Sequence, residues 1–141
     1  MLFVGLVSCS PPTTVAPKAQ TQNRLKNIYH ALRILESENH TNIGRLLQNS
    51  TETNLQKGLL VLLSNNSQTL GFDPKIIDKK ILSDGYGRRF NVEFKTNLLS
   101  KFGPTALTEA GFDVVVWSNG SNGVNENGFG DDVYLTKENR K

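Results

Sequence analysis

The C-terminal part of the chain, residues 112–134, reads Phe-Asp-Val-Val-Val-Trp-Ser-Asn-Gly-Ser-Asn-Gly-Val-Asn-Glu-Asn-Gly-Phe-Gly-Asp-Asp-Val-Tyr. Its first six residues are mostly β-branched or aromatic, which is typical of a β-strand. The remainder is dense in side chains that offer oxygen, contains four glycines, and ends in the pair Asp131 and Asp132. A strand that opens into a loop of this composition is the feature on which the interpretation of the whole chain depends.

The composition of the loop suggests a calcium site. Ca²⁺ takes six to eight oxygen ligands from carboxylates, Asn side chains and backbone carbonyls, and glycine lets the backbone turn tightly enough to direct carbonyls inward. The loop is not an EF-hand, because that motif is flanked by helices. The alternative is an ordinary exposed loop, since Gly, Asn, Ser and Asp are also the usual residues of turns.

Two helices are expected upstream. Residues 18–38 carry one apolar stripe with helical spacing, and residues 53–64 carry a Leu-rich face preceded by candidate N-cap residues. The stripe consists of Leu25, Ile28, Tyr29, Leu32 and Leu35. The candidate N-cap residues are Ser50, Thr51 and Thr53. His30 is expected at the surface or at the edge of the stripe. Residues 68–82 are expected to form an irregular connection with a short strand.

A small antiparallel sheet is expected to follow. Asp84-Gly85 is a turn signal, and residues 89–95 alternate apolar and polar side chains, as a half-buried strand does. A long connection over residues 96–111 leads to the strand 112–117, and residues 133–135 are a candidate last strand. The predicted fold class is therefore α+β, with two helices packed on the sheet.

Composition sets further bounds. The chain has 141 residues, 37% hydrophobic and 21% charged, which suits one globular domain. The net charge of +3 is scattered, without the basic stripe and interleaved aromatics of a nucleic-acid-binding protein. No nucleophile elbow, phosphate loop or zinc spacing is present, and His30 and His40 have no catalytic partners nearby in the sequence. We therefore expect a protein that is not an enzyme.

The single cysteine, Cys9, has a specific context. It follows the apolar or small residues 2–8, and Leu6-Val-Ser-Cys9 resembles the bacterial lipobox, in which the cysteine becomes lipidated. The Pro-rich residues 10–17 resemble a lipoprotein tether. Residues 1–17 are thus expected to be a lipoprotein-type signal and tether, and residues 18–141 the globular domain, anchored by lipid on the periplasmic or surface side of a bacterial envelope. The apolar run is too short for a transmembrane helix.

The order of features over residues 18–135 resembles the major pseudopilin of type II secretion, in the type IV pilin superfamily. Asp84-Gly-Tyr-Gly87 is similar to the family's Asp-Pro-Trp-Gly turn, with Gly and Tyr in place of Pro and Trp. Ser118-Asn-Gly-Ser-Asn-Gly123 is similar to the start of the family's loop, and Asp131-Asp-Val133 to its acidic end. The lipoprotein-like N-terminus stands in place of the usual prepilin leader.

The resemblance implies a pilin-like fold and a Ca²⁺-binding loop. Its implied ligands are the carbonyl of Asn119, Asn122 in the position of the family's first Asp, and Asp131 and Asp132, with Asn125 and Asn127 as substitutes. Asn122 in place of Asp removes one negative charge, which weakens calcium binding.

Two functions are consistent with these features. The first is a structural or assembly protein of the envelope, which packs against other pilin-like or secretion-system proteins. The second is a lipid-anchored, stand-alone binding module whose calcium-ordered loop recognises a surface ligand. The absence of the family's apolar assembly helix from this sequence favours the second, whereas a shortage of exposed aromatic residues argues against it.

Overall fold

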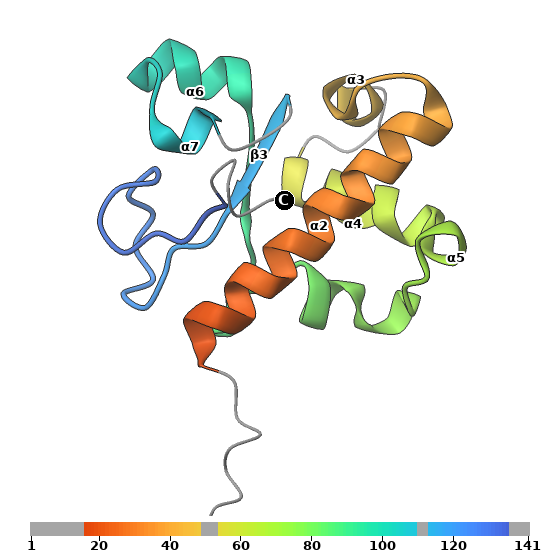
Figure 1. The fold of residues 1–141 in the computed structure, drawn as a ribbon, viewed down its shortest axis with the longest axis horizontal. Helices are drawn as coiled ribbons and strands as arrows, with labels where there is room; N and C mark the ends of the chain where they lie inside the picture. The colour runs from red at the N-terminus through yellow and green to blue at the C-terminus, as the bar shows by residue number, and fades with distance from the viewer. Residues whose placement is uncertain (1–15, 49–53, 110–112, 136–141) are drawn as a thin grey trace, which may run out of the picture.

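The computed structural model describes residues 16–48, 54–109 and 113–135. Within these residues the chain has a mixed α+β fold, in which a long helix, several shorter helices and a two-stranded antiparallel sheet pack together (Figure 1). In chain order the elements are α2 (Pro17–Asn39), α3 (Ile43–Gln48), α4 (Leu55–Asn65), α5 (Ser67–Leu70), η2 (Pro74–Ile76), η3 (Ile77–Ile81), β2 (Asn91–Phe94), α6 (Lys95–Phe102), α7 (Ala106–Glu109) and β3 (Val114–Trp117).

Helix α2 is the first and longest element, and it confirms the predicted helix. Pro17 occupies its first turn, where the missing N–H costs nothing, and His40 ends it in the left-handed conformation, with φ of 51°. Every residue of the predicted apolar stripe is buried, and His30 is exposed as expected. Among the described helices, none combines the length and apolar character needed to cross a membrane.

Helix α4 confirms the second predicted helix, with a different cap. Its N-cap is Asn54, whose side-chain oxygen accepts the N–H of Lys57 at 3.2 Å; the cap candidates at residues 50–53 lie outside the described residues. Leu59 and Leu63 are fully buried. The side chain of Gln56 donates to the carbonyl of Phe90 at 2.7 Å, so the helix is tied to the segment that leads into the sheet.

Strands β2 and β3 confirm the two predicted strands. They pair antiparallel, with Asn91 opposite Trp117 and Phe94 opposite Val114. Strand β3 is buried along its whole length. Its side chains alternate between two apolar clusters, since Val114 and Val116 join the large core around α2, whereas Val115 and Trp117 join a smaller cluster. The smaller cluster is completed by Leu98 of α6 and Leu107 of α7, with Tyr134 packed against it.

The hydroxyl of Tyr29 fixes β3 to α2. It accepts the N–H of Val116 at 3.0 Å and donates to the carbonyl of the same residue at 3.3 Å. Val116 faces Val92 in the register of the sheet. A strand that is buried on both faces therefore also has a polar connection to the longest helix.

Three expectations about the connections were wrong. Residues 68–82 contain α5, η2 and a turn of π-helix instead of a strand, because Asp73 caps the turn that Pro74 starts and Ile77 and Ile81 are buried from a helical backbone. The described part of the connection expected over residues 96–111 contains α7 and all of α6 except its first residue, Lys95. Residues 133–135 form no strand of their own, although Val133 makes an isolated antiparallel bridge with Ser118.

Candidate metal centre

The turn at residues 84–87 and the start of the C-terminal loop meet at a buried carboxylate. Asp84 is 1% exposed. Its Oδ1 accepts the N–H groups of Tyr86 at 3.0 Å and Arg88 at 2.8 Å, and its Oδ2 accepts the hydroxyl of Ser118 at 2.6 Å. Oγ of Ser118 in turn accepts the N–H of Gly120 at 3.0 Å. The two segments that carry the family resemblance are therefore joined by a continuous chain of hydrogen bonds.

The same turn rests on the N-terminal turns of α2. The N–H of Gly85 donates to Oγ1 of Thr21 at 2.8 Å, and the guanidinium of Arg24 donates to the carbonyls of Ser83 and Asp84. A Cβ on residue 85 would lie 2.2 Å from the carbonyl oxygen of Pro17. Only glycine allows the turn to approach the helix this closely.

The loop closes where its two ends meet. Gly120 has φ of 71°, and a Cβ there would lie 2.1 Å from the carbonyl oxygen of Asp131. Oδ2 of Asp131 accepts the hydroxyl of Ser121 at 2.7 Å and the N–H of Asn122 at 2.9 Å. Arg88 also supports this end, since its side chain donates to the carbonyl of Gly120 at 3.1 Å.

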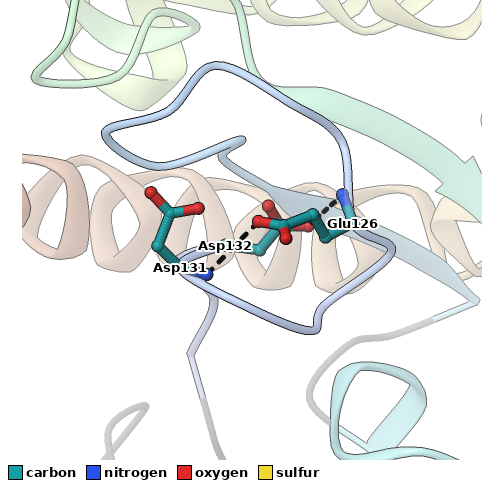
Figure 2. Close-up of side chains that lie close together, drawn as sticks. All are labelled: Glu126, Asp131 and Asp132. Atoms are coloured by element: carbon teal, nitrogen blue, oxygen red, sulfur yellow. Dashed lines mark hydrogen bonds between the residues drawn. The ribbon is translucent and has the colours of Figure 1, made fainter.

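Three carboxylates come together inside the closed loop. Glu126, Asp131 and Asp132 each offer an oxygen, and these oxygens all lie within 4.8 Å of one another. Figure 2 shows Glu126 reaching across the loop towards the two aspartates. Oε1 of Glu126 accepts the N–H of Asp131 at 3.3 Å, and Oδ2 of Asp132 accepts the N–H of Glu126 at 2.9 Å. Both the side chain and the backbone N–H of Glu126 are thus bonded to the acidic pair at the end of the loop.

Two oxygens in this cluster are buried without a hydrogen-bond partner in the described part of the chain. They are Oδ1 of Asp131 and Oδ1 of Asp132. Asp132 is only 9% exposed, and its other oxygen is fully used by the N–H groups of Glu126 and Gly128, both at 2.9 Å. A buried carboxylate oxygen without a donor costs free energy, and a bound cation would remove that cost.

The two aspartates differ in their acidity. Burial, with a smaller contribution from the charges of Glu126 and Asp131, raises the pKa of Asp132 above its ordinary value, against the opposing effect of its backbone hydrogen bonds. Hydrogen bonds from Ser121 and from the backbone of Asn122 lower the pKa of Asp131. A cation would favour the charged form of both residues, because an opposite charge nearby lowers the pKa of a carboxyl group.

The structure brings together only part of the predicted ligand set. Asp131 and Asp132 belong to the cluster, and the amide of Asn122 borders it, donating to Oε1 of Glu126 at 3.0 Å. The side chain of Asn119 bonds to Asn91 and to the carbonyl of Gly123, and the role of its backbone carbonyl as a ligand stays a prediction.

Asn125 is engaged elsewhere. Its Oδ1 accepts the indole N–H of Trp117 at 3.1 Å and the N–H of Asn127 at 3.0 Å. Since Trp117 is 3% exposed, this contact holds the middle of the loop against the smaller apolar cluster. The structure thus gives Asn125 a role in shaping the loop.

Glu126 is the functional candidate that the sequence interpretation missed. The resemblance covers the two ends of the loop, whereas Glu126 lies in its middle. One signal was available: between Ser118 and Asp131, Glu126 is the only residue with a carboxylate. A loop that closes on itself brings such a residue near the acidic pair at its end.

The chemistry of the cluster fits a hard divalent cation. Its donors are all oxygen, with no histidine or cysteine among them, and carboxylates with backbone carbonyls are the ligands of Ca²⁺ and Mg²⁺. The loop is also well supplied with its own hydrogen bonds: the side chain of Asn122, for example, accepts the N–H of Val124 at 2.8 Å. A closed loop that holds no ion is therefore the alternative to a metal centre.

Comparison with known proteins gave no match to a protein-family model, to a curated protein or to a solved structure.

Proposed function

We propose that this chain is a non-enzymatic protein of the bacterial envelope, similar to a type II secretion pseudopilin, with a structural or assembly role and a loop stabilised by calcium. The turn and the loop support the resemblance, because the residues that match the family pattern are also those that bond to each other through Asp84 and Ser118. Partners would be other pilin-like or secretion-system proteins.

The calcium part of the proposal is carried by the buried, unpartnered Oδ1 of Asp132. Glu126, Asp131 and Asp132 would hold the ion, which supplies no chemistry beyond neutralising three negative charges and fixing the loop. Bringing three carboxylates within 4.8 Å of one another is unfavourable without a counterion. Calcium is preferred over Mg²⁺ because a loop closed by glycines offers the flexible, irregular geometry that Ca²⁺ tolerates.

Calcium titration with thermal unfolding of the full chain tests this part. An ion that binds only the folded protein stabilises it by about 2.7 kcal/mol at a hundredfold excess over Kd. We expect the unfolding temperature to rise with Ca²⁺ and to fall again with EDTA. Asp73→Asn is a control for the loss of an acidic residue, since Asp73 is exposed and lies outside the loop. Its unfolding temperature should respond to Ca²⁺ and EDTA as that of the natural chain does. An unfolding temperature that ignores both Ca²⁺ and EDTA would refute the calcium site.

Lipid attachment at Cys9 is the proposed anchor, and it lies outside the described residues. Metabolic labelling with a radioactive fatty acid tests it. We expect label on the natural chain and none on Cys9→Ala. Label that persists in the variant would exclude this cysteine as the anchor.

Deletion of the gene, followed by an assay of protein secretion, tests the assembly role. We expect reduced secretion and rescue by the natural chain. We also expect chemical cross-linking in cells to join the chain to a protein of the pilin superfamily. Normal secretion together with no such cross-link would reject the assembly role.

A lipid-anchored binding module is the second candidate, favoured by one observation. The loop presents two apolar side chains to solvent, since Val124 is 57% and Phe129 is 60% exposed. Such side chains at a loop tip are suited to contact a surface ligand. This candidate predicts retention of the protein on bacterial surface material that EDTA or Phe129→Ser abolishes. Retention that neither treatment changes would speak against it.

A further inference from the structure

The loop contains three Asn-Gly pairs, and the structure distinguishes them. They are Asn119-Gly120, Asn122-Gly123 and Asn127-Gly128. Asparagine followed by glycine is the dipeptide in which the backbone nitrogen of the second residue most readily attacks the side-chain carbonyl of the first, because glycine has no Cβ to hinder the approach. In a folded protein the attack also requires that this backbone nitrogen is free of its own hydrogen bond.

Two of the three glycine nitrogens are engaged. The N–H of Gly120 donates to Oγ of Ser118 at 3.0 Å, and the N–H of Gly128 donates to the buried Oδ2 of Asp132 at 2.9 Å. The N–H of Gly123 has no acceptor within the described residues. Asn122 is also exposed, whereas Gly120 is buried, so water reaches the first pair least easily.

The surroundings of Asn122 favour the reaction in two further ways. Its Oδ1 accepts the N–H of Val124 at 2.8 Å, which draws electron density away from the carbonyl carbon under attack. The guanidinium of Arg88 lies beside Gly123, with its Cζ 2.7 Å from the position that a Cβ would take. A positive charge there favours loss of the proton from the attacking amide.

We propose that Asn122 is a site of spontaneous deamidation in the folded protein, and that the product supplies a fourth carboxylate beside Glu126, Asp131 and Asp132. The backbone nitrogen of Gly123 bonds to Cγ of Asn122 and loses its proton, and the bond from Cγ to Nδ2 breaks, so that ammonia leaves. Water then opens the resulting cyclic imide at either carbonyl, giving aspartate or isoaspartate. Both products carry a carboxylate in place of the amide.

The change would alter the demand of the loop for a cation. At present Nδ2 of Asn122 donates to Oε1 of Glu126 at 3.0 Å. After deamidation two carboxylates would meet at this point and repel each other unless a cation lay between them. This effect on calcium binding is the second half of the proposal, and it rests on the proposed calcium site. Deamidation would then slowly and irreversibly increase the calcium dependence of the loop.

Peptide mapping by mass spectrometry tests the first half. The natural full chain is kept folded in warm, mildly alkaline buffer, and deamidation at the three asparagines is followed with time. We expect Asn122 to react about fivefold faster than Asn119 or Asn127, the factor that corresponds to one backbone hydrogen bond that need not be broken first. In denaturant the three rates should converge. Equal rates in the folded protein, or an unchanged preference in denaturant, would overturn the proposal.

Calcium titration of Asn122→Asp against the natural chain tests the second half. We expect the variant to bind Ca²⁺ about tenfold more tightly, because it adds a unit charge next to the ion. We also expect Asn122→Asp to unfold at a lower temperature than the natural chain in EDTA. Equal affinity would overturn the effect on calcium. If neither protein bound Ca²⁺, the proposed calcium site would fail, while the preference for Asn122 would stand or fall on the mapping alone.

Discussion

The core around α2 and the loop at residues 118–133 are stabilised in opposite ways. Around α2, apolar side chains from helices and strands pack with almost no exposure. In the loop, carboxylates and amides make many of the contacts, and two of the three apolar side chains, Val124 and Phe129, are exposed. Figure 1 shows the loop at the left edge of the molecule, on the far side of α2 from α5.

This difference determines what each region responds to. Apolar burial is insensitive to ions at ordinary concentrations, whereas a cluster of carboxylates responds to pH, salt and divalent cations. The two regions are joined through Asp84 and Ser118, which are both buried. We therefore expect substitutions in the core to act equally with and without calcium, and substitutions in the loop to act differently in the two conditions.

The largest effect is expected in the core. Leu32 is fully buried in α2, and Leu32→Ala should lower the free energy of unfolding by about 3 kcal/mol, because it removes apolar contacts and leaves a cavity. Urea unfolding measures the loss, which should be the same in Ca²⁺ and in EDTA. Val124→Ala, at an exposed loop position, is the control and should change stability by less than about 0.5 kcal/mol. A calcium-dependent loss for Leu32→Ala would contradict the separation of the two regions.

The next largest effect is expected where the regions join. Asp84→Ala leaves the N–H groups of Tyr86 and Arg88 and the hydroxyl of Ser118 without their acceptor, which should cost about 2 to 3 kcal/mol. Ser118→Ala removes one of these bonds together with the bond from the N–H of Gly120, and it should cost about 1 to 2 kcal/mol. Unlike Leu32→Ala, both should also weaken calcium binding, as measured by titration calorimetry. Unchanged affinity in both variants would show that the junction does not position the loop.

The regions also differ in how far the sequence predicts them. The helices and strands of the core are predicted well, because the periodicity of apolar residues depends only on local spacing along the chain. The apolar stripe of α2, the apolar face of α4 and the alternation in β2 are each visible as such spacing. Helix α6 was missed since its sequence, Lys-Thr-Asn-Leu-Leu-Ser-Lys-Phe, buries only Leu98 and therefore lacks a readable stripe. Gly103, which lies within the predicted long connection, marks the end of that helix.

The loop was predicted by composition and only in part by residue. Composition alone indicated oxygen donors, but which donors meet depends on how the loop folds back on itself. The contact between Gly120 and Asp131, and the bond from Asn125 to Trp117, are non-local and leave no periodic signal. The same fold-back brings Glu126 to the aspartates and directs the side chain of Asn125 to Trp117.

A smaller effect, with a change of sign, is expected at Asp132. Asp132→Asn removes a buried charge that repels Glu126 and Asp131, so in EDTA the variant should be as stable as the natural chain or more stable, by up to about 1 kcal/mol. In Ca²⁺ the order should reverse, because the variant has lost a charged ligand. Thermal unfolding in the two conditions measures both. A variant that is less stable by the same amount in each would show that Asp132 acts only through its hydrogen bonds.

The smallest effect is the pH dependence of the loop without calcium, and its two aspartates should contribute with opposite signs. The raised pKa of Asp132 means that the folded protein holds its proton more tightly than the unfolded chain, so this residue's contribution to stability falls as pH rises from the ordinary Asp value of 3.8 through the higher folded value. The lowered pKa of Asp131 has the opposite effect: its contribution is present above 3.8 and is lost as pH falls through the lower folded value.

Urea unfolding in EDTA between roughly pH 3 and pH 6 separates these contributions when the natural chain is compared with Asp132→Asn and Asp131→Asn. Relative to Asp132→Asn, the natural chain should lose stability as pH rises; relative to Asp131→Asn, it should gain. Leu32→Ala should follow the pH profile of the natural chain, because Leu32 has no titrating group. If both differences had the same sign, the two aspartates would share one environment, and the buried oxygen of Asp132 would no longer distinguish it as the residue that needs a cation.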